Sequence, residues 1–257
     1  MSRVLVVDIG NSTTRAGLWQ AEGITHARTG RTSELHSVAD VDTLVEPLLE
    51  ELDAERGESE IALCSAVPHA EAMWLEWAAR TGAAAFVVTG TTPAPLENRY
   101  ARPAQLGPDR LAAAVGAVRR VGAPVIVVSL GTATVVDLVS GEGRLLGGAI
   151  SAGLETGLAA LAERAAALPR ITPAQPERVF GADTEQCLLS GAVHGTAALI
   201  EGLVSRFQEA LGGAAPVALT GGHAQLVSPH LRVEHEVFPD LVLEGAGAIW
   251  EYNRGAD

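Results

Sequence analysis

The sequence is poor in cysteine, in aromatic residues and in positive charge, and each shortage narrows the class of protein. The two cysteines, Cys64 and Cys187, stand beside apolar residues, which indicates buried free thiols in a reducing compartment rather than a disulfide pair or a metal site. Aromatic residues make up 4% of the 257 residues, so close packing of helices on sheets is favoured over an aromatic-rich sandwich. The net charge of −13 argues against a surface that binds nucleic acid or anionic membranes.

The sequence also lacks a recognisable targeting segment. Its N-terminus enters a strand directly, without a basic region followed by an apolar one, and no apolar run approaches transmembrane length. We therefore expect a cytoplasmic protein with no nucleic-acid or membrane partner. A hydrophobic content of 47% is sufficient for the cores of two compact domains or one large domain.

What the sequence contains is organised around residues 1–17. The β-branched run at 3–7 predicts a strand that ends at Asp8, and after a turn a second strand is predicted from Thr13 to Trp19. A carboxylate at the end of a buried strand, followed by glycine and small polar residues, is typical of a phosphate site. Backbone N–H groups can approach phosphate oxygens there, and the carboxylate can hold Mg²⁺ through water. A β-hairpin with a polar tip is the alternative interpretation.

Strands and helices then alternate. The periodicity predicts a helix at 36–56, a strand at 60–67, a helix at 71–81 and a strand at 84–88. This alternation indicates an α/β layer with an antiparallel edge contributed by the opening hairpin.

A polar loop at 96–107 leads into a helix that begins near Pro108. Asp109 and Arg110 therefore stand at or near a helix N-terminus. Taken alone, Asp109 would be interpreted as a capping carboxylate.

The opening arrangement returns in the second half of the chain. An apolar strand at 123–128 is followed by a turn at 129–134 and a second strand at 135–139. The recurrence suggests an internal duplication, in which one turn from each half grips the phosphates of a nucleotide. A recurrent hairpin without function is the alternative.

The remainder predicts a glycine-rich strand end at 145–153 and helices at 154–168 and 185–211. A strand at 217–220 ends in a further glycine-rich turn, and a last helix reaches residue 253. Small residues at 191, 192 and 195 leave one side of the long helix thin enough for another helix or a partner subunit.

Five motifs stand in a specific order: DIGNST at 8–13, GPDR at 107–110, LGTATVVD at 130–137, GGAISAG at 147–153 and TGGHA at 220–224. With them the chain resembles, over essentially its whole length, the type III pantothenate kinases of the actin/hexokinase/Hsp70 superfamily. The resemblance implies an α/β fold with two ribonuclease-H-like (actin-like ATPase) domains, residues 1–118 and 119–257. Their mixed sheets would be flanked by helices, with a cleft between the domains.

The resemblance further implies a homodimer that phosphorylates pantothenate with ATP at the first step of coenzyme A synthesis. Its cofactors would be Mg²⁺ or another divalent cation and a monovalent cation, K⁺ or NH₄⁺. Asp109 matches the catalytic residue that activates the pantothenate hydroxyl. The resemblance implies that ATP is contacted by Asp8, Gly10, Asn11, Ser12, Thr13, Gly131, Thr132, Ala133, Gly221 and Gly222. Pantothenate would be contacted by Tyr100, Gly107, Pro108, Asp109, Arg110 and Thr184. The metal ligands would be Asp8 and Ser129.

The chain departs from the family pattern at Ser129, where the second phosphate motif usually begins with aspartate. Serine keeps a hydrogen bond but removes a negative charge from a site expected to help hold a cation. Two further hypotheses therefore stand beside an active kinase. One is an impaired relative that binds nucleotide or pantothenate and acts as a regulator, and the other is a kinase or hydrolase of a different acceptor.

Overall fold

The computed structural model describes residues 4–20, 23–52 and 60–255. The chain forms two compact units, residues 1–120 together with 240–257, and residues 121–239. The predicted domain boundary had the whole of 119–257 in the second domain. The last 18 residues instead belong to the first unit, because their helix buries its apolar face on the first sheet.

The first unit is built on a mixed five-stranded sheet in the order β3-β2-β1-β4-β5. Strands β1 (Val4–Ile9), β2 (Thr13–Gln20) and β3 (Gly23–Arg31) are antiparallel neighbours. Strands β4 (Glu60–Ser65) and β5 (Ala84–Val88) run parallel to β1. The carboxyl ends of β1, β4 and β5 therefore meet at one edge, where binding residues of α/β sheets gather.

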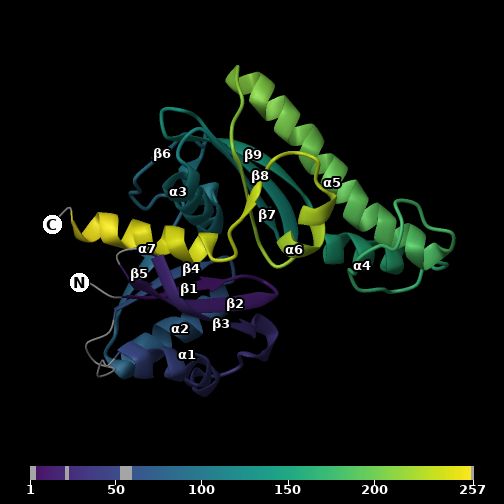
Figure 1. Ribbon diagram of the computed structural model, residues 1–257. Helices are drawn as coiled ribbons and strands as arrows, with labels where there is room; N and C mark the ends of the chain where they lie inside the picture. The colour runs from purple at the N-terminus through teal and green to yellow at the C-terminus, as the bar shows by residue number, and fades with distance from the viewer. Residues whose placement is uncertain (1–3, 21–22, 53–59, 256–257) are drawn as a thin grey trace. The chain divides into compact units, whose positions relative to one another are not determined.

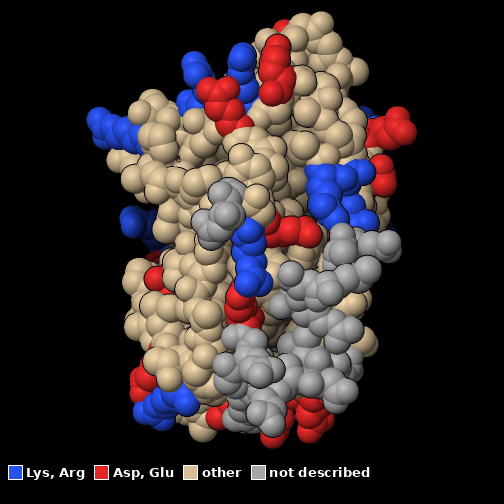
Figure 2. Space-filling view, turned by 90° about the vertical axis from the view of Figure 1, so that its left-hand side faces the viewer, with Lys and Arg blue, Asp and Glu red and all other residues tan. Residues whose placement is uncertain are grey.

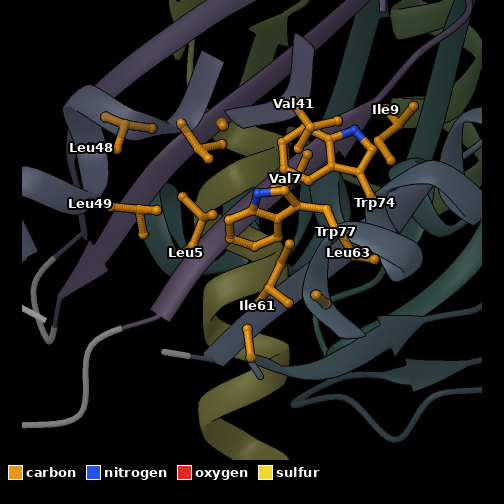
Figure 3. Packing of buried hydrophobic residues seen from close by; sticks show 14 of the residues in the cluster. Leu5, Val7, Ile9, Val41, Leu48, Leu49, Ile61, Leu63, Trp74 and Trp77 are labelled. Carbon is orange, nitrogen blue, oxygen red and sulfur yellow. The ribbon is translucent and has the colours of Figure 1, made fainter. Parts of the chain in front are cut away.

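Helices cover both faces of this sheet. Helices α1 (Val38–Leu52) and α2 (Pro68–Thr81) lie on one face and α7 (Leu241–Arg254) on the other (Figure 1). The core beneath α1 and α2 is centred on Trp74 and Trp77, whose rings meet edge to face with centroids 6.2 Å apart. Apolar residues of β1, β4 and α1 surround them, as Figure 3 shows.

Helix α3 (Pro108–Val121) packs against α7 through glycines. A Cβ atom on Gly245 would lie 1.7 Å from the carbonyl oxygen of Ala112, and one on Gly116 would lie 2.3 Å from that of Leu241. The two helix backbones therefore approach too closely for any side chain at these positions. This contact fixes α3, whose first turn carries Asp109.

The second unit repeats the strand arrangement of the first. Its sheet contains β9 (Arg144–Ala152), β8 (Ala133–Val139), β7 (Val125–Leu130), β10 (Val217–Thr220) and β11 (Glu236–Val237) in that order. The first three are antiparallel neighbours, and β10 and β11 run parallel to β7. The duplication predicted from the two turns is therefore present in the topology.

Helix α5 (Thr184–Leu211) and helix α4 (Leu154–Arg164) belong to this second unit. The buried residues of α5 line the second core with apolar residues of β7, β8 and β10. By length and composition α5 could also cross a membrane, and 28% of its most apolar window is buried. The expectation that no run reaches that length is therefore wrong.

Most predicted elements are present with shifted ends. The helix expected at 36–56 begins at Val38, and its last predicted residues, 53–56, lie outside the described chain. Strand β3 was missed, since its sequence mixes polar residues and glycine and most of it is exposed. The glycine-rich segment at 145–153 lies almost wholly in strand β9.

Candidate active site

The first phosphate-type turn is closed and braced from behind. The amide of Gly10 donates to the carbonyl of Thr13 at 3.0 Å. Buried Thr32, at the start of the short helix η1 (Thr32–Glu34), donates its hydroxyl to the Gly10 carbonyl at 2.6 Å and its amide to the Ser12 carbonyl at 3.1 Å. A third contact joins the hydroxyls of Thr32 and Thr14 at 3.0 Å. The turn is thus held in one conformation while the side chains at 11–13 are exposed.

Asp8 stands beside this turn in the last part of β1, half-buried, opposite Arg15 on β2 and Cys64 on β4. The pKa of Asp8 is raised from its ordinary value of 3.8 to about 7, first by burial and then by the charge of Asp109, whereas Arg15 acts in the opposite direction. Arg15 is itself held by Asp240, with Nη2 2.6 Å from Oδ1. The site therefore holds two carboxyl groups that are costly to ionise together.

Asp109 lies in the first turn of α3, as predicted, but it is not the capping residue. The carbonyl of Gly107 accepts from the amides of Arg110 at 3.1 Å and Leu111 at 3.2 Å, so Gly107 is the N-cap. A Cβ atom on Gly107 would lie 2.4 Å from Oδ1 of Asp109. The carboxylate therefore lies close against the glycine, and a larger residue at 107 would displace it from this position.

Arg110, the next residue, is buried with 6% of its surface exposed. Its guanidinium lies 5.2 Å from the ring centroid of Tyr100, and Nη1 donates to the tyrosine hydroxyl at 3.3 Å. A cation over an aromatic face is stabilised by the ring quadrupole and keeps its hydrogen-bond donors at the ring edge. This pair is suited to bind an anionic group such as a carboxylate.

The second phosphate-type turn joins β7 to β8. The amide of Gly131 donates to the carbonyl of Ala133 at 3.0 Å, so this turn is also closed by its glycine amide but is one residue shorter than the first. The carbonyl of Thr132 accepts from the amide of Gly153 at 3.0 Å and from the hydroxyl of Thr156 at 2.7 Å. A Cβ atom on Gly153 would lie 2.1 Å from the Gly131 carbonyl oxygen. The start of α4 therefore packs directly on this turn.

The glycine-rich turn after β10 packs on the same place. Gly221 has a φ of +96°, and a Cβ atom there would lie 2.5 Å from the Leu130 carbonyl oxygen. That carbonyl accepts from the amide of His223 at 3.0 Å. Gly222 has open space around it. The structure thus brings together Gly131, Thr132, Ala133, Gly221 and Gly222, which were predicted from separate motifs.

Ser129 lies on β7 between Thr220 of β10 and Val135 of β8. Asp137 of β8 stands two residues beyond Val135, so its side chain projects from the same face of the sheet as Ser129. It is buried, and a Cβ atom on Gly148 would lie 2.5 Å from its Oδ1. Asp137 therefore retains a carboxylate on that face, at a different position from the one that serine vacates.

Thr184 is the first residue of α5 and is exposed. The preceding Asp183 caps the helix by accepting from the amide of Gln186 at 2.9 Å. Thr184 belongs to the second unit, whereas Tyr100, Asp109 and Arg110 belong to the first. The acceptor residues predicted from the sequence thus come from both units.

Four residues of this site were missed by sequence reasoning: Thr32, Arg15, Asp240 and Asn98. The register of the opening hairpin places Arg15 opposite Asp8, so counting across the turn could have found it. Thr32 and Asp240 act through contacts between segments far apart in the sequence, and no local pattern marks them. Asn98 acts locally, through hydrogen bonds to Gly90 and Tyr100, but it belongs to none of the motifs.

Positive charge in the chain comes from arginine alone, apart from histidine and the N-terminus, since all 18 basic residues are arginines. On the face drawn in Figure 2 these arginines stand among acidic side chains. Within the described residues no group of three or more His, Cys, Asp or Glu side chains suits a metal ion. A cation here would therefore need few protein ligands, which is the usual binding of Mg²⁺ to a nucleotide.

Comparison with known proteins identifies the family pattern. The family model for type III pantothenate kinase matches residues 4–206. A type III pantothenate kinase of Roseiflexus sp. (strain RS-1) is 37% identical over 260 residues, which cover 98% of this chain and 99% of that protein. One from Dehalococcoides mccartyi is 32% identical over 255 residues, 98% of this chain and 97% of that protein.

Solved structures agree in fold at low sequence identity. Component A of the (R)-2-hydroxyglutaryl-CoA dehydratase of Acidaminococcus fermentans matches with a TM-score of 0.58 at 13% identity, covering 100% of both chains. The ROK hexokinase of Thermus thermophilus matches with a TM-score of 0.55 at 15% identity, again over 100% of both. These matches show the actin-like ATPase fold that the motifs predicted.

Proposed function

The chain belongs to the type III pantothenate kinase family, and on that premise we propose which residues bind the substrates and catalyse the reaction. Enzymes of this family phosphorylate pantothenate with ATP at the first step of coenzyme A synthesis. The observation that carries the proposal is the electrostatic coupling of Asp8 and Asp109 within one unit. Asp8 adjoins the braced turn at 10–13, and Asp109 adjoins the Tyr100–Arg110 pair. Phosphate and acceptor residues thus lie close enough to influence one another's charge.

Asp109 is the catalytic residue. Its carboxylate accepts a hydrogen bond from the primary hydroxyl of pantothenate and orients that oxygen toward the γ-phosphorus of ATP. Phosphoryl transfer requires mainly alignment of the attacking oxygen and neutralisation of charge, and a carboxylate partner can receive the hydroxyl proton. Gly107 and Pro108 shape the first turn of α3 around this carboxylate.

Arg110 binds the carboxylate of pantothenate, with Tyr100 packed against its guanidinium. The planar guanidinium matches a carboxylate with two parallel N–H donors. Because Arg110 is buried, the ion pair forms in a region of low dielectric and is stronger than at the surface. Thr184 adds a contact to pantothenate from the second unit.

The residues around Asp8 fit a divalent cation such as Mg²⁺. Burial and Asp109 make the ionised form of Asp8 costly, and a cation would offset that cost. Asp8 would hold the ion through water, and Ser129 would contribute a hydroxyl. When bound with ATP, the ion neutralises charge on the phosphates.

The remaining ATP contacts come from the two glycine turns. Backbone amides of Asn11, Ser12 and Thr13 face one end of the phosphate chain, and Gly10, whose own amide closes the turn, leaves room for the phosphate beside it. Those of Thr132 and Ala133 face the other end, where the Gly131 amide closes the turn. Gly221 and Gly222 leave room for the nucleoside. We place a monovalent cation, K⁺ or NH₄⁺, near Ser129. The protein works as a cytoplasmic homodimer, with the small-residue side of α5 available to a partner subunit.

The test is pantothenate-dependent formation of ADP by the purified protein with Mg-ATP, with and without K⁺ or NH₄⁺. We expect turnover in the wild type and a loss of at least 100-fold in kcat for Asp109→Asn, the size expected when a positioned acid–base group is removed. Comparing kcat of the wild type with that of Ser129→Asp measures how much activity is lost by having serine at this position. An inactive wild type that gains activity as Ser129→Asp would make the natural protein an impaired relative rather than an active kinase.

A further inference from the structure

We propose that Asn98 is a positioning residue for pantothenate, which holds Tyr100 and through it Arg110 in the geometry that binds the substrate carboxylate. The proposal rests on the acceptor roles given above to Tyr100 and Arg110. Asn98 ends the two-residue strand β6 (Glu97–Asn98) in the loop that precedes α3. Neither its position in the sequence nor the motifs of the chain point to it.

The side-chain amide of Asn98 connects two segments of backbone. Its Nδ2 donates to the carbonyl of Gly90 at 2.8 Å, and its Oδ1 accepts from the amide of Tyr100 at 2.9 Å. Both bonds are part-buried and have good length. Both ends of one amide group are therefore used, so the side chain fixes Tyr100 relative to the end of strand β5.

Gly90 is a rigid anchor for this contact. It is buried, and a Cβ atom there would lie 2.4 Å from the carbonyl oxygens of both Pro103 and Leu106. The loop at 97–107 thus passes closely around Gly90 and is tied to it again by Asn98. The Thr89 hydroxyl hydrogen-bonds to those of Thr91 and Thr92, each at 3.1 Å, which stiffens the same turn.

The contact then continues to the substrate-binding pair. Tyr100 packs on the buried guanidinium of Arg110, and the following α3 turn carries Asp109. Without Asn98 the Tyr100 amide and the Gly90 carbonyl lose their partners, and the loop can rearrange to recover hydrogen bonds to water. A shift of about 1 Å in a positioning residue is sufficient to lower substrate binding substantially. The expected effect is on pantothenate, whereas the ATP turns at 10–13 and 131–133 are separate.

The experiment compares Asn98→Ala and Asn98→Asp with a matched control, Asn253→Ala. Asn253 also donates to a backbone carbonyl of the segment after β5, that of Pro93 at 2.9 Å, but has no bond to the loop that carries Tyr100. We expect Asn98→Ala to raise KM for pantothenate about tenfold with KM for ATP within twofold of wild type, as for the loss of two hydrogen bonds. Asn98→Asp keeps the acceptor for Tyr100 and should raise KM less. Asn253→Ala should leave both constants unchanged.

A double variant identifies the route of the effect. If Asn98 acts through Tyr100, then Asn98→Ala combined with Tyr100→Ala should have the same pantothenate KM as Tyr100→Ala alone. The proposal would be overturned if the two substitutions each raised KM for pantothenate independently, so that the double variant showed the product of the two increases. An unchanged KM for pantothenate in Asn98→Ala would also overturn it. A parallel rise in both KM values with a lowered melting temperature in both Asn98 variants would show a merely structural role. Full activity of Asp109→Asn would instead overturn the proposed acceptor site. Failure of the proposed function can therefore be distinguished from failure of the role given to Asn98.

Discussion

Replacing Asp8 with asparagine should stabilise the free protein at neutral pH while removing its activity. The carboxyl group of Asp8 has a pKa of about 7 in the folded chain against an ordinary value of 3.8. Folding therefore favours the protonated form, and ionisation at neutral pH costs stability. The same carboxylate is the proposed partner of the nucleotide-bound cation, so the destabilising group is also the functional one.

The magnitude follows from the shift in pKa. One unit corresponds to 1.36 kcal/mol, so about three units correspond to ~4 kcal/mol. Asp8 is half-buried, and solvent screening lowers this figure to about 2–4 kcal/mol. Below pH 3.8 the group is protonated in both states and costs nothing. Between pH 3.8 and about 7 the stability of the wild type falls as pH rises, and above pH 7 the full cost applies.

The assay is thermal unfolding of wild type and Asp8→Asn between pH 5 and 8.5, without nucleotide or metal. At pH 8 we expect the variant to melt at least ~4 °C higher, since each kcal/mol corresponds to about 2–4 °C for a chain of this size. The difference should shrink steadily toward pH 5. Mg-ATP should raise the melting temperature of the wild type more than that of the variant, which keeps the glycine turns but loses the carboxylate that holds the cation. Parallel melting profiles across the pH range, or a variant less stable at pH 8, would refute the reasoning.

Two other substitutions test features of the fold. Thr32→Val keeps the shape of the residue that holds the first turn but removes its hydroxyl. KM for Mg-ATP should therefore rise roughly 5–10-fold while KM for pantothenate stays constant. Thr29→Val on exposed β3 is the control, and equal effects of the two substitutions would contradict the role given to Thr32. Gly245→Ala should destabilise the protein by about 3 kcal/mol or more in urea unfolding, because its Cβ atom would overlap the Ala112 carbonyl. An unchanged unfolding midpoint would show that α3 and α7 can separate at little cost.

The sequence predicts the elements that local pattern determines. The two strand–turn–strand units, the helix that begins at Pro108 and the glycine-rich turn after residue 220 all follow from residue types within a few positions of one another. Their recurrence also predicts the repeated sheet topology. Asp8, Asp109, Arg110 and the second glycine turn are positioned by these local elements, which is why reasoning from the sequence reaches them.

Contacts between distant segments are the part that sequence reasoning misses. Asp240 pairs with Arg15 across 225 residues, and Thr32 braces Gly10 across 22. Strand β3 has no apolar alternation because it forms an exposed edge of its sheet. The domain to which residues 240–257 belong depends on which sheet buries α7, and the apolar periodicity of that helix is equally compatible with either sheet.

The return of the chain to its first unit has a consequence for biosynthesis. Residues 121–239 form a continuous stretch, so the second unit is complete once residue 239 has left the ribosome. The first unit is not, because α7 supplies buried Leu241, Ile249 and Trp250. Trp250 also donates to Glu60 at 2.9 Å, 190 residues earlier. The β1–β4 face that α7 covers therefore stays exposed throughout synthesis of the second unit, and apolar surface exposed in this way makes a nascent chain prone to aggregation.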